Sequence, residues 1–265
     1  MANRQADLAE LLHVLRLPTM AKVFSDWALR AAKDKLTHEA FLYQLVTAEL
    51  EGRTQRRTER LKKLSGLPPD KTFQSLKLGR FDTATRAQIE RLKTGVFLQD
   101  ATNIVAVGKP GCGKSHLACA IGHALIEQAR PVLFCSTYQL VQDLLAAKRD
   151  LRLPKAMEKL ARFDCLILDD IGYVQQDREE MEVLFTLLAE RYERQSVIIT
   201  TNLVFSEWNK IFKDPMTTMA AIDRVVHHSV ILDLMAVESY RAEAASKQRR
   251  SGIGETNLQL AAATQ

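Results

Sequence analysis

A glycine-rich segment in the middle of the chain, Gly108-Lys-Pro-Gly-Cys-Gly-Lys-Ser115, sets the strictest limit on its fold. The segment fits the phosphate-loop pattern G-x-x-x-x-G-K-[ST] at every position, follows an apolar run and opens a helical pattern. Glycines let such a loop curl until its backbone N–H groups point at one anion, and the helix that follows adds the positive end of its dipole. A glycine-rich turn that binds nothing is the plain alternative. The context favours a strand, a phosphate-binding loop and a helix in succession.

Two side chains of this segment have distinct predicted roles. Lys114 supplies a positive charge for the β- and γ-phosphates, and the Ser115 hydroxyl is a hard oxygen ligand of the kind that Mg²⁺ prefers. We expect the nucleotide to contact the loop and the residue after it, which are Gly108, Lys109, Pro110, Gly111, Cys112, Gly113, Lys114, Ser115 and His116. The predicted cofactors are therefore ATP and Mg²⁺.

A second motif, Cys165-Leu-Ile-Leu-Asp169-Asp170, ends an apolar run with two acids. A carboxylate pair at the end of a buried strand is costly unless it meets a cation, and in a doubly wound sheet these strand ends line the ligand crevice. Asp169 is the expected Mg²⁺ partner, and Asp170 the acid that orients and polarises the attacking water. An ordinary Asp-Asp turn after a strand is the alternative.

A third run, Ser196-Val-Ile-Ile-Thr-Thr-Asn202, also ends in a polar residue. Asn202 could hold the attacking water or an oxygen of the γ-phosphate. Asn is also common in plain turns at strand ends, and without the other two motifs that interpretation would be preferred.

From residue 103 onward, short β-branched runs alternate with helical patterns. The runs are Asn103–Val107, Pro131–Cys135, Asp164–Asp169, Ser196–Thr201 and Ser229–Leu232, and the clearest helical patterns are Lys114–Ala129 and Arg178–Arg194. Strands that alternate with helices imply right-handed crossovers and a buried parallel sheet. The predicted fold is therefore α/β, with a five-stranded parallel sheet.

The first part of the chain has only helical patterns. Leucines recur at helical spacing before Pro18, a second pattern covers Thr19–Ala32, and Thr37 is the expected N-cap of a longer helix that ends near Leu64. The Gly66-Leu-Pro-Pro-Asp sequence is the best candidate for a boundary. We expect a small helical domain at 1–66, a connector and the start of the ATPase region at 67–102, the ATPase core at 103–246, and a loose tail at 247–265.

The long N-terminal helix has a basic stripe. Arg53, Arg56, Arg57 and Arg60 fall on one face, and Lys63 extends the charge. Leu42, Val46 and Leu50 precede them, so we expect the helix to pack through its first half and to present cations to DNA phosphates with its second. A solvated helix with arginine as a good helix former is the alternative.

Composition narrows the class of protein. The chain has 265 residues, a net charge of +5 and 46% hydrophobic residues, which argues against wholesale disorder and permits nucleic-acid binding without requiring it. No apolar run is long enough to span a bilayer, and the N-terminus has no secretory pattern. The four cysteines form no Cys-x-x-Cys pair, so we expect reduced thiols in a cytoplasmic protein that does not contact membranes.

The order of these motifs resembles that of AAA+ ATPases. The runs Leu-Ile-Leu-Asp-Asp-Ile-Gly-Tyr and Glu238-Ser-Tyr-Arg241, together with the helical N-terminus, are similar to the IstB-like transposition helpers, which share a branch with the DnaC helicase loaders. The resemblance covers about residues 5–245. It implies a P-loop AAA+ core behind a small all-helical N-terminal domain.

The resemblance also implies two arginine roles. Arg224 resembles the finger that reaches the nucleotide of a neighbouring subunit, and Arg241 resembles the second sensor arginine, which acts on its own subunit's nucleotide. Arg178 and Arg191 are rival candidates for the finger. The chain departs from many AAA+ members at Asp170, where they carry Glu, so hydrolysis is expected to be slow or partner-dependent.

The implied function is an ATP-dependent DNA-binding helper of transposition. Such a protein oligomerises on duplex DNA with little sequence preference, bends it, and delivers it to a cognate transposase. A DnaC-like helicase loader and a nucleotide-gated DNA-binding module with negligible hydrolysis are the alternatives.

Overall fold

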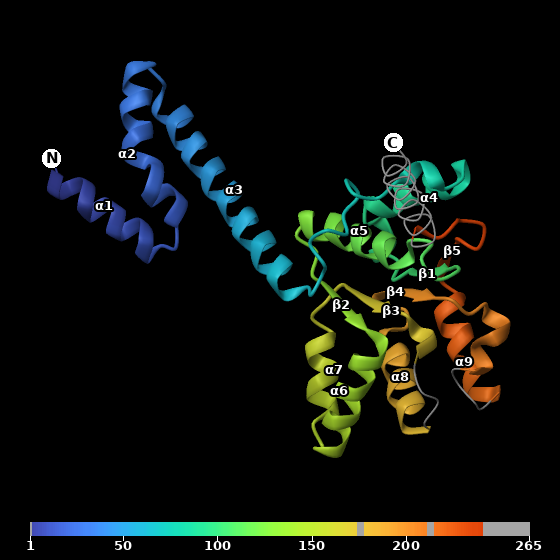
Figure 1. Cartoon of the computed structure of the whole chain (residues 1–265). Coiled ribbons are helices and arrows are strands. Elements are labelled where there is room, and N and C mark those ends of the chain that lie inside the picture. Colours follow the sequence, from blue (N-terminus) through green and yellow to red (C-terminus); the bar gives the residue numbers. More distant parts are fainter. Residues whose placement is uncertain (1, 174–177, 211–214, 241–265) are drawn as a thin grey trace, which may run out of the picture. The chain divides into compact units, whose positions relative to one another are not determined.

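The computed structural model describes residues 2–173, 178–210 and 215–240. The chain divides into two compact units, residues 1–60 and residues 61–265 (Figure 1). The first unit is helical, and the second contains a five-stranded sheet with helices on both faces. Each unit has its own hydrophobic core, and each is described separately below.

The first unit contains the helices predicted for it. They are α1 (Ala2–Val14), α2 (Pro18–Lys33) and most of α3 (His38–Leu64). Thr37 is the N-cap of α3, because its hydroxyl accepts a hydrogen bond of 3.2 Å from the Ala40 N–H. Met20 and Phe24 of α2 pack against Leu45 of α3 in a small core. Such a small core makes a 60-residue unit marginally stable by itself.

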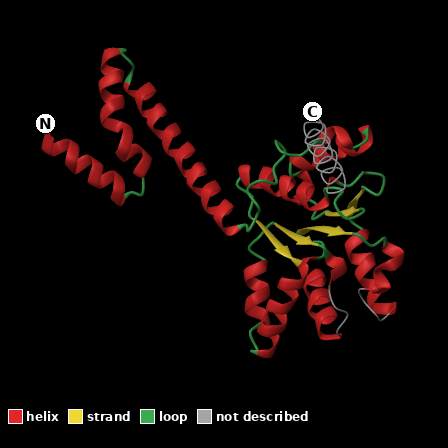
Figure 2. Ribbon diagram, in the orientation of Figure 1, coloured by secondary structure: helices red, strands yellow, loops and turns green. Residues whose placement is uncertain are grey.

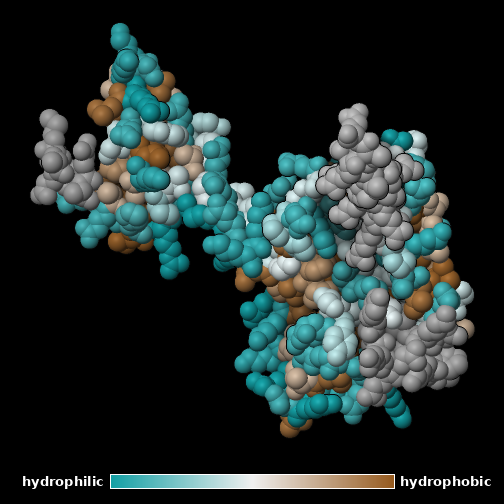
Figure 3. All heavy atoms as spheres, viewed as in Figure 1, coloured by the Kyte–Doolittle hydropathy of each residue, from teal (hydrophilic) through white to brown (hydrophobic). Residues whose placement is uncertain are grey.

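The packing face of α3 differs from the predicted one. Leu42, Val46 and Leu50 are 55%, 44% and 60% exposed, so the expectation that they pack is wrong. The buried seam instead contains Leu45 and Glu49, each of which directly precedes an exposed residue, Val46 or Leu50, and so lies about 100° around the helix from it. Apolar side chains therefore remain on the surface of this unit, visible as brown spheres in Figure 3.

The sheet of the second unit has the predicted strands. They are β1 (Asn103–Val107), β2 (Val132–Ser136), β3 (Cys165–Asp169), β4 (Ser196–Thr201) and β5 (Ser229–Asp233). All neighbouring strands are parallel, in the order β2-β3-β4-β1-β5. Every residue of β1 and β4 is buried, as expected for central strands with helices on both faces. The predicted α/β class with a five-stranded parallel sheet is confirmed.

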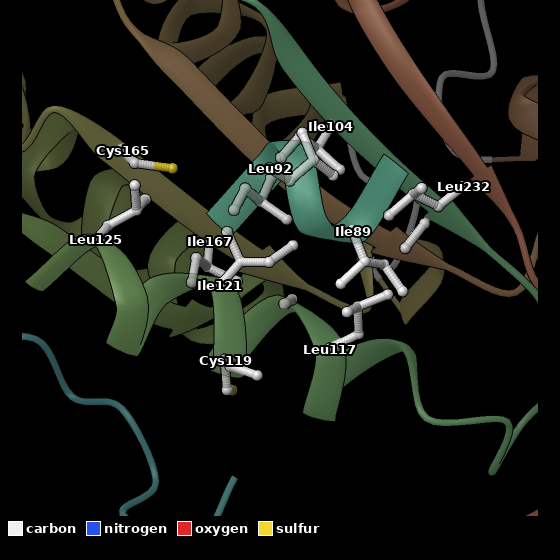
Figure 4. Packing of buried hydrophobic residues seen from close by; sticks show 14 of the residues in the cluster. Ile89, Leu92, Ile104, Leu117, Cys119, Ile121, Leu125, Cys165, Ile167 and Leu232 are labelled. Carbon is white, nitrogen blue, oxygen red and sulfur yellow. The ribbon is translucent and has the colours of Figure 1, made fainter. Parts of the chain in front are cut away.

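Helices cover both faces of this sheet (Figure 2). One face carries α4 (Thr83–Lys93) and α5 (Lys114–Glu127), and the other carries α6 (Thr137–Arg149), α7 (Leu153–Leu160), α8 (Arg178–Arg191) and α9 (Pro215–Val226). Short 3₁₀ turns η1 (Leu78–Arg80), η2 (Val96–Leu98), η3 (Ile171–Tyr173) and η4 (Phe205–Lys210) join them. Figure 4 shows Ile121 of α5 beside Ile167 of β3, and Leu117 of α5 beside Ile89 of α4. Truncating one of these side chains to Ala would cost about 2–5 kcal/mol.

The segment before β1 belongs to the core of the second unit. Leu67, Leu76 and Phe81 are buried in the cluster that α4 and α5 form with the sheet. The packing division therefore falls between Arg60 and Leu61. The functional division at residue 66 stays a prediction.

Burial explains the chemistry of the thiols. Cys119, Cys135 and Cys165 are free, and burial raises the pKa of each to about 12.

Among the described residues, no helix has the length and apolar character that a bilayer crossing requires.

Candidate nucleotide site

The position of β4 brings the three predicted motifs together. β4 lies between β1, which leads into the phosphate loop, and β3, which ends in the two acids. The Gly108 N–H donates a hydrogen bond of 3.2 Å to the Thr201 carbonyl, so the start of the loop is tied to the end of β4. Because the carboxyl ends of parallel strands meet at one edge of a sheet, Lys114, Asp169 and Asn202 belong to the same edge.

The phosphate loop has the backbone of an anion nest. Gly111 and Gly113 have φ values of 83° and 102°, in the left-handed region that favours glycine. Gly113 is also the residue before α5, so the free N–H groups of the first turn of α5 begin at the loop. The Lys114 ammonium donates hydrogen bonds of 2.7 Å and 3.0 Å to the carbonyls of Gly108 and Lys109. It is therefore held within the loop.

Other loop residues contribute through the backbone. The Cys112 side chain is fully buried in the hydrophobic core, while Lys109 and Pro110 are exposed. The His116 ring contacts the segment before α4, because its Nε2 lies 3.0 Å from the Thr72 carbonyl and 3.1 Å from the Ser75 hydroxyl. For a phosphate ligand, the backbone N–H of His116 is thus the more accessible group.

Two threonines hold the acid pair, one from β4 and one from the start of α6. The Thr200 hydroxyl of β4 donates to Asp169 Oδ1 at 2.6 Å and accepts the Asp170 N–H at 2.8 Å. On the other side, the Thr137 hydroxyl at the start of α6 donates to the Asp169 carbonyl at 3.0 Å. Asp170 has a φ of 59°, so the chain turns sharply directly after β3. Sequence reasoning missed both threonines, although Thr200 lies within the Thr-Thr-Asn run.

Asp170 has the electrostatics of a reactive acid. Burial raises its pKa above the ordinary value, the neighbouring Asp169 carboxylate raises it further, and Lys114 lowers it. Its Oδ1 is buried and has no hydrogen-bond partner among the described residues. A buried carboxylate oxygen without a partner is costly, and a bound water or ligand would satisfy it.

Asn202 packs closely against the turn that follows the acids. A Cβ on Gly172 would lie 2.7 Å from Asn202 Oδ1, so a larger residue at this position would have to displace the Asn202 side chain. Asn202 Oδ1 is buried and has no hydrogen-bond partner in the described part of the chain. Asp170 and Asn202 therefore each present an unsatisfied oxygen, and no sequence motif indicated that Gly172 packs against one of them.

The donor set of this edge fits Mg²⁺. The Ser115 hydroxyl and Asp169 Oδ2 are hard oxygen atoms, and neither has a hydrogen-bond partner within the described ranges. Mg²⁺ usually keeps several waters and takes one or two protein ligands beside substrate phosphates. The pair that the sequence predicts suits that pattern.

The segment after β5 lies against the phosphate loop. The Tyr240 N–H donates to the Gly111 carbonyl at 2.9 Å, and a Cβ on Gly113 would lie 3.2 Å from the Tyr240 ring. The Arg80 guanidinium stacks on this ring at 3.9 Å from its centroid, and it donates to the Glu238 carbonyl at 3.1 Å. Arg241, the predicted second sensor, lies outside the described residues.

The candidate finger arginines differ in their availability. Arg191 is 3% exposed and donates to the carbonyls of Leu160, Phe163 and Ser196, so it is committed to its own chain. Burial lowers the pKa of Arg191 to about 10. Arg178 is exposed at the start of α8.

Arg224 of α9 stacks over Phe185, with its guanidinium carbon 4.6 Å from the ring centroid. Its Nη1 is buried and has no hydrogen-bond partner among the described residues, while the side chain as a whole is partly exposed. Arg224 and Arg178 therefore remain candidates for a contact with a second subunit.

The basic stripe of α3 divides into two groups. Arg53 and Arg56 are about half exposed, and both bind Glu49 Oε1, at 3.2 Å and 2.9 Å. They also donate to the Arg16 carbonyl and the Thr19 hydroxyl, so they fasten α3 to the corner between α1 and α2. In contrast, Arg57, Arg60 and Lys63 are exposed and form no ion pair within the described residues.

Comparisons with known proteins show the family to which the chain belongs. The sequence model of a family described as "IstB-like ATP binding protein" matches residues 10–248. The chain belongs to this IstB-like ATP-binding family. An insertion-sequence ATP-binding protein of Sinorhizobium fredii is 44% identical over 247 residues, which are 93% of this chain and 83% of the relative. An IS21 insertion-sequence ATP-binding protein of Pseudomonas aeruginosa is 33% identical, over 93% of this chain and 92% of the relative.

The solved structures that this chain resembles are more distant from it in sequence than these relatives are. The match to DnaI has a TM-score of 0.54 at 14% identity and covers 64% of this chain and 95% of the other. The match to AMPPCP-bound DnaA from Aquifex aeolicus has a TM-score of 0.53 at 17% identity and covers 64% of this chain but 51% of DnaA. These likenesses establish the P-loop AAA+ fold of the second unit.

Proposed function

We propose that this IstB-like protein is an ATP-dependent DNA-binding helper of transposition. In this proposal it binds ATP and Mg²⁺ at the edge of the sheet, oligomerises on duplex DNA, bends it and delivers it to a cognate transposase. The observation that carries the proposal is the convergence of Lys114, Asp169 and Asn202 around β4 in a chain 44% identical to an insertion-sequence ATP-binding protein. We expect it to act in the cytoplasm.

The chain's own residues have defined roles in the proposed hydrolysis. Lys114 and the N–H groups of the loop bind phosphates, and Ser115 and Asp169 would hold Mg²⁺, which supplies charge neutralisation on the β- and γ-phosphates. Asp170 orients the attacking water and accepts its proton, and Asn202 holds the water or a γ-phosphate oxygen. Arg224 would complete the site from a neighbouring subunit, and Arg241 from its own.

DNA binding is assigned to the exposed part of the α3 stripe. Arg57, Arg60 and Lys63 can reach phosphates without breaking an ion pair with a described residue. Each phosphate that a cation neutralises releases counterions, so this contact gives affinity without base readout. Arg53 and Arg56 keep about half of their side chains exposed and contribute in a secondary way.

A nucleotide-gated module with very slow turnover is the second candidate. It is favoured by the short side chain of Asp170, because a longer acid at this position would reach farther toward the attacking water. A phosphate-release assay with and without duplex DNA separates the two functions. DNA-stimulated release supports the helper, and its absence at saturating ATP supports the module.

The test of the nucleotide site uses two lysines of the same loop. Lys114→Ala should abolish binding of a fluorescent ATP analogue in Mg²⁺, since it removes the buried ammonium. Lys109→Ala is the matched control, because the Lys109 side chain is exposed, and it should bind nearly as wild type. Equal affinity of the two variants would contradict the assignment.

A further inference from the structure

The Thr200 hydroxyl connects the two acids of the site. It donates to Asp169 Oδ1 at 2.6 Å and accepts the Asp170 N–H at 2.8 Å. Thr200 is 1% exposed, so water does not compete for either bond. One buried hydroxyl thus fixes the side chain of the first acid and the backbone of the second.

The register between β3 and β4 explains why the Thr200 side chain is the one that reaches both acids. β3 and β4 pair in register from Cys165 opposite Ser196 to Leu168 opposite Ile199, which places Asp169 beside Thr200. At Asp170 the chain turns into the left-handed region, with a φ of 59°, and the Asp170 N–H bonds the Thr200 side chain. The side-chain bond therefore takes over at the point where the backbone ladder ends.

The bond to Asp169 leaves the second carboxylate oxygen available. Thr200 occupies Oδ1, while Oδ2 has no hydrogen-bond partner among the described residues. A carboxylate that is hydrogen-bonded at one oxygen presents its other oxygen in a fixed orientation. Residues that hydrogen-bond to metal ligands commonly orient those ligands in this way. The Ser115 hydroxyl is equally free of described partners.

We propose that Thr200 is a positioning residue for the metal: its hydroxyl orients Asp169 toward Mg²⁺ and fixes the turn that carries Asp170. The inference rests on the proposed ATP hydrolysis. Loss of the hydroxyl would allow Asp169 to rotate and would weaken Mg²⁺ binding, while nucleotide contacts made by the loop would persist.

A purely structural hydroxyl makes a different prediction. It would lower the melting temperature when removed and leave the Mg²⁺ dependence unchanged. Thr200→Val keeps the shape and removes the hydrogen bonds, whereas Thr200→Ser keeps the hydroxyl. Ser196→Ala is the matched control, because Ser196 lies fully buried at the other end of β4 and its hydroxyl lies 3.5 Å from the Phe97 carbonyl.

The experiment measures Mg²⁺ dependence in the full-length protein. A fluorescent, slowly hydrolysed ATP analogue is titrated first in EDTA and then with increasing Mg²⁺, and ATP turnover is followed over the same Mg²⁺ range. For Thr200→Val we expect the half-saturating Mg²⁺ concentration to rise by about 10–100-fold, with turnover falling by a similar factor. Binding in EDTA should match wild type, Thr200→Ser should recover most of the loss, and Ser196→Ala should behave as wild type.

Each outcome decides between the two roles. A wild-type Mg²⁺ dependence for Thr200→Val, with only a lower melting temperature, would overturn the inference. If Thr200→Val does not fold, Thr200→Cys keeps the size with a weaker donor and should shift the Mg²⁺ dependence in the same direction; an unshifted Cys variant also overturns it. If wild type itself shows neither Mg²⁺-dependent binding nor turnover, the proposed function fails instead.

Discussion

Gly172 lies so close to Asn202 that a side chain added at residue 172 would have to displace the Asn202 amide. Gly172→Ala would place a Cβ 2.7 Å from Asn202 Oδ1, and the displaced amide could no longer hold a water or phosphate oxygen. We expect turnover to fall about 10-fold or more, since removal of one positioned polar group costs this much in related sites. ATP affinity should change much less. A phosphate-release assay at saturating ATP measures the effect.

The control for this variant is Gly79→Ala. A Cβ at Gly79 meets nothing within 4 Å, so that variant should retain wild-type turnover. Wild-type turnover in Gly172→Ala would mean that Asn202 has no part in the reaction. Equal losses in both variants would indicate a general effect of the substitutions.

The site residues that could be predicted from the sequence are those with a fixed spacing or an unusual cost. Lys114 belongs to a spaced motif, and Asp169 and Asp170 are acids at the end of an apolar strand. Thr200 could not be predicted, because threonine is an ordinary strand residue and its partner is set by the order of the strands. The close packing of Gly172 against Asn202 is a contact between residues 30 apart in sequence, so no local pattern indicates it.

At the scale of elements, Glu49 joins α2 and α3. Its carboxylate accepts the Thr19 and Met20 N–H groups at the start of α2, at 2.8 Å and 3.0 Å, and it also binds Arg53 and Arg56. Burial alone would raise the pKa of Glu49, but the hydrogen bonds from Met20, Arg53, Thr19 and Arg56 outweigh it, so the pKa is lowered.

This network predicts that acid weakens the first unit. Because the folded pKa of Glu49 is lowered, its contribution is complete above the ordinary value of 4.5 and is lost as the pH falls through the lower folded pKa. Glu49→Gln should remove that pH dependence and destabilise α2 at neutral pH by about 1–3 kcal/mol. Hydrogen exchange of residues 18–33 in the full chain, corrected for intrinsic rates, measures it. Glu51 is exposed, so residues 18–33 of the Glu51→Gln variant should exchange as in wild type. Equal protection of these residues in the Glu49→Gln and Glu51→Gln variants would refute the role of Glu49.

The two groups of arginines on α3 should contribute differently to DNA binding. Arg57→Ala combined with Arg60→Ala should reduce the slope of log affinity against log salt by about 2, because each lost phosphate contact removes about 0.9. Exchange in α2 should stay unchanged, since neither side chain bonds another described residue. Arg53→Ala combined with Arg56→Ala should instead loosen α2. An unchanged salt slope in the first pair would remove this face of α3 from the DNA interface.

The elements themselves were largely predictable, and the error on α3 has a physical cause. Helical periodicity placed the three N-terminal helices, and β-branched runs placed the strands within one or two residues. The packing face of α3 was missed because Glu49 interrupts its apolar seam, and an acid is rarely buried unless it is paired. Here Met20 and Arg53 are among the partners that make burial possible, and they were invisible in the helix's own pattern.

At the scale of the whole molecule, the proposed hydrolysis calls for a cation supplied by a second subunit. Charge develops on the transferred phosphoryl group, and a cation from outside commonly neutralises it. Arg191 is buried among its own backbone carbonyls, whereas Arg224 is partly exposed and its Nη1 lacks a described partner. The strand order that brings the motifs together could not be predicted from the spacing of the motifs alone.

A mixing experiment tests whether Arg224 acts between subunits. Arg224→Ala keeps its own acids but lacks the finger, and Asp170→Asn lacks the acid but keeps the finger. Each variant alone should lose about 10³-fold or more in turnover. In a mixture, an Arg224→Ala subunit can receive the finger of an Asp170→Asn neighbour, so activity should reappear and pass through a maximum as the ratio is varied. Phosphate release with duplex DNA present measures it. If Arg224 acts on its own subunit's nucleotide, every mixture stays as inactive as its components, and an Arg178→Ala variant that complements in its place would transfer the role to Arg178.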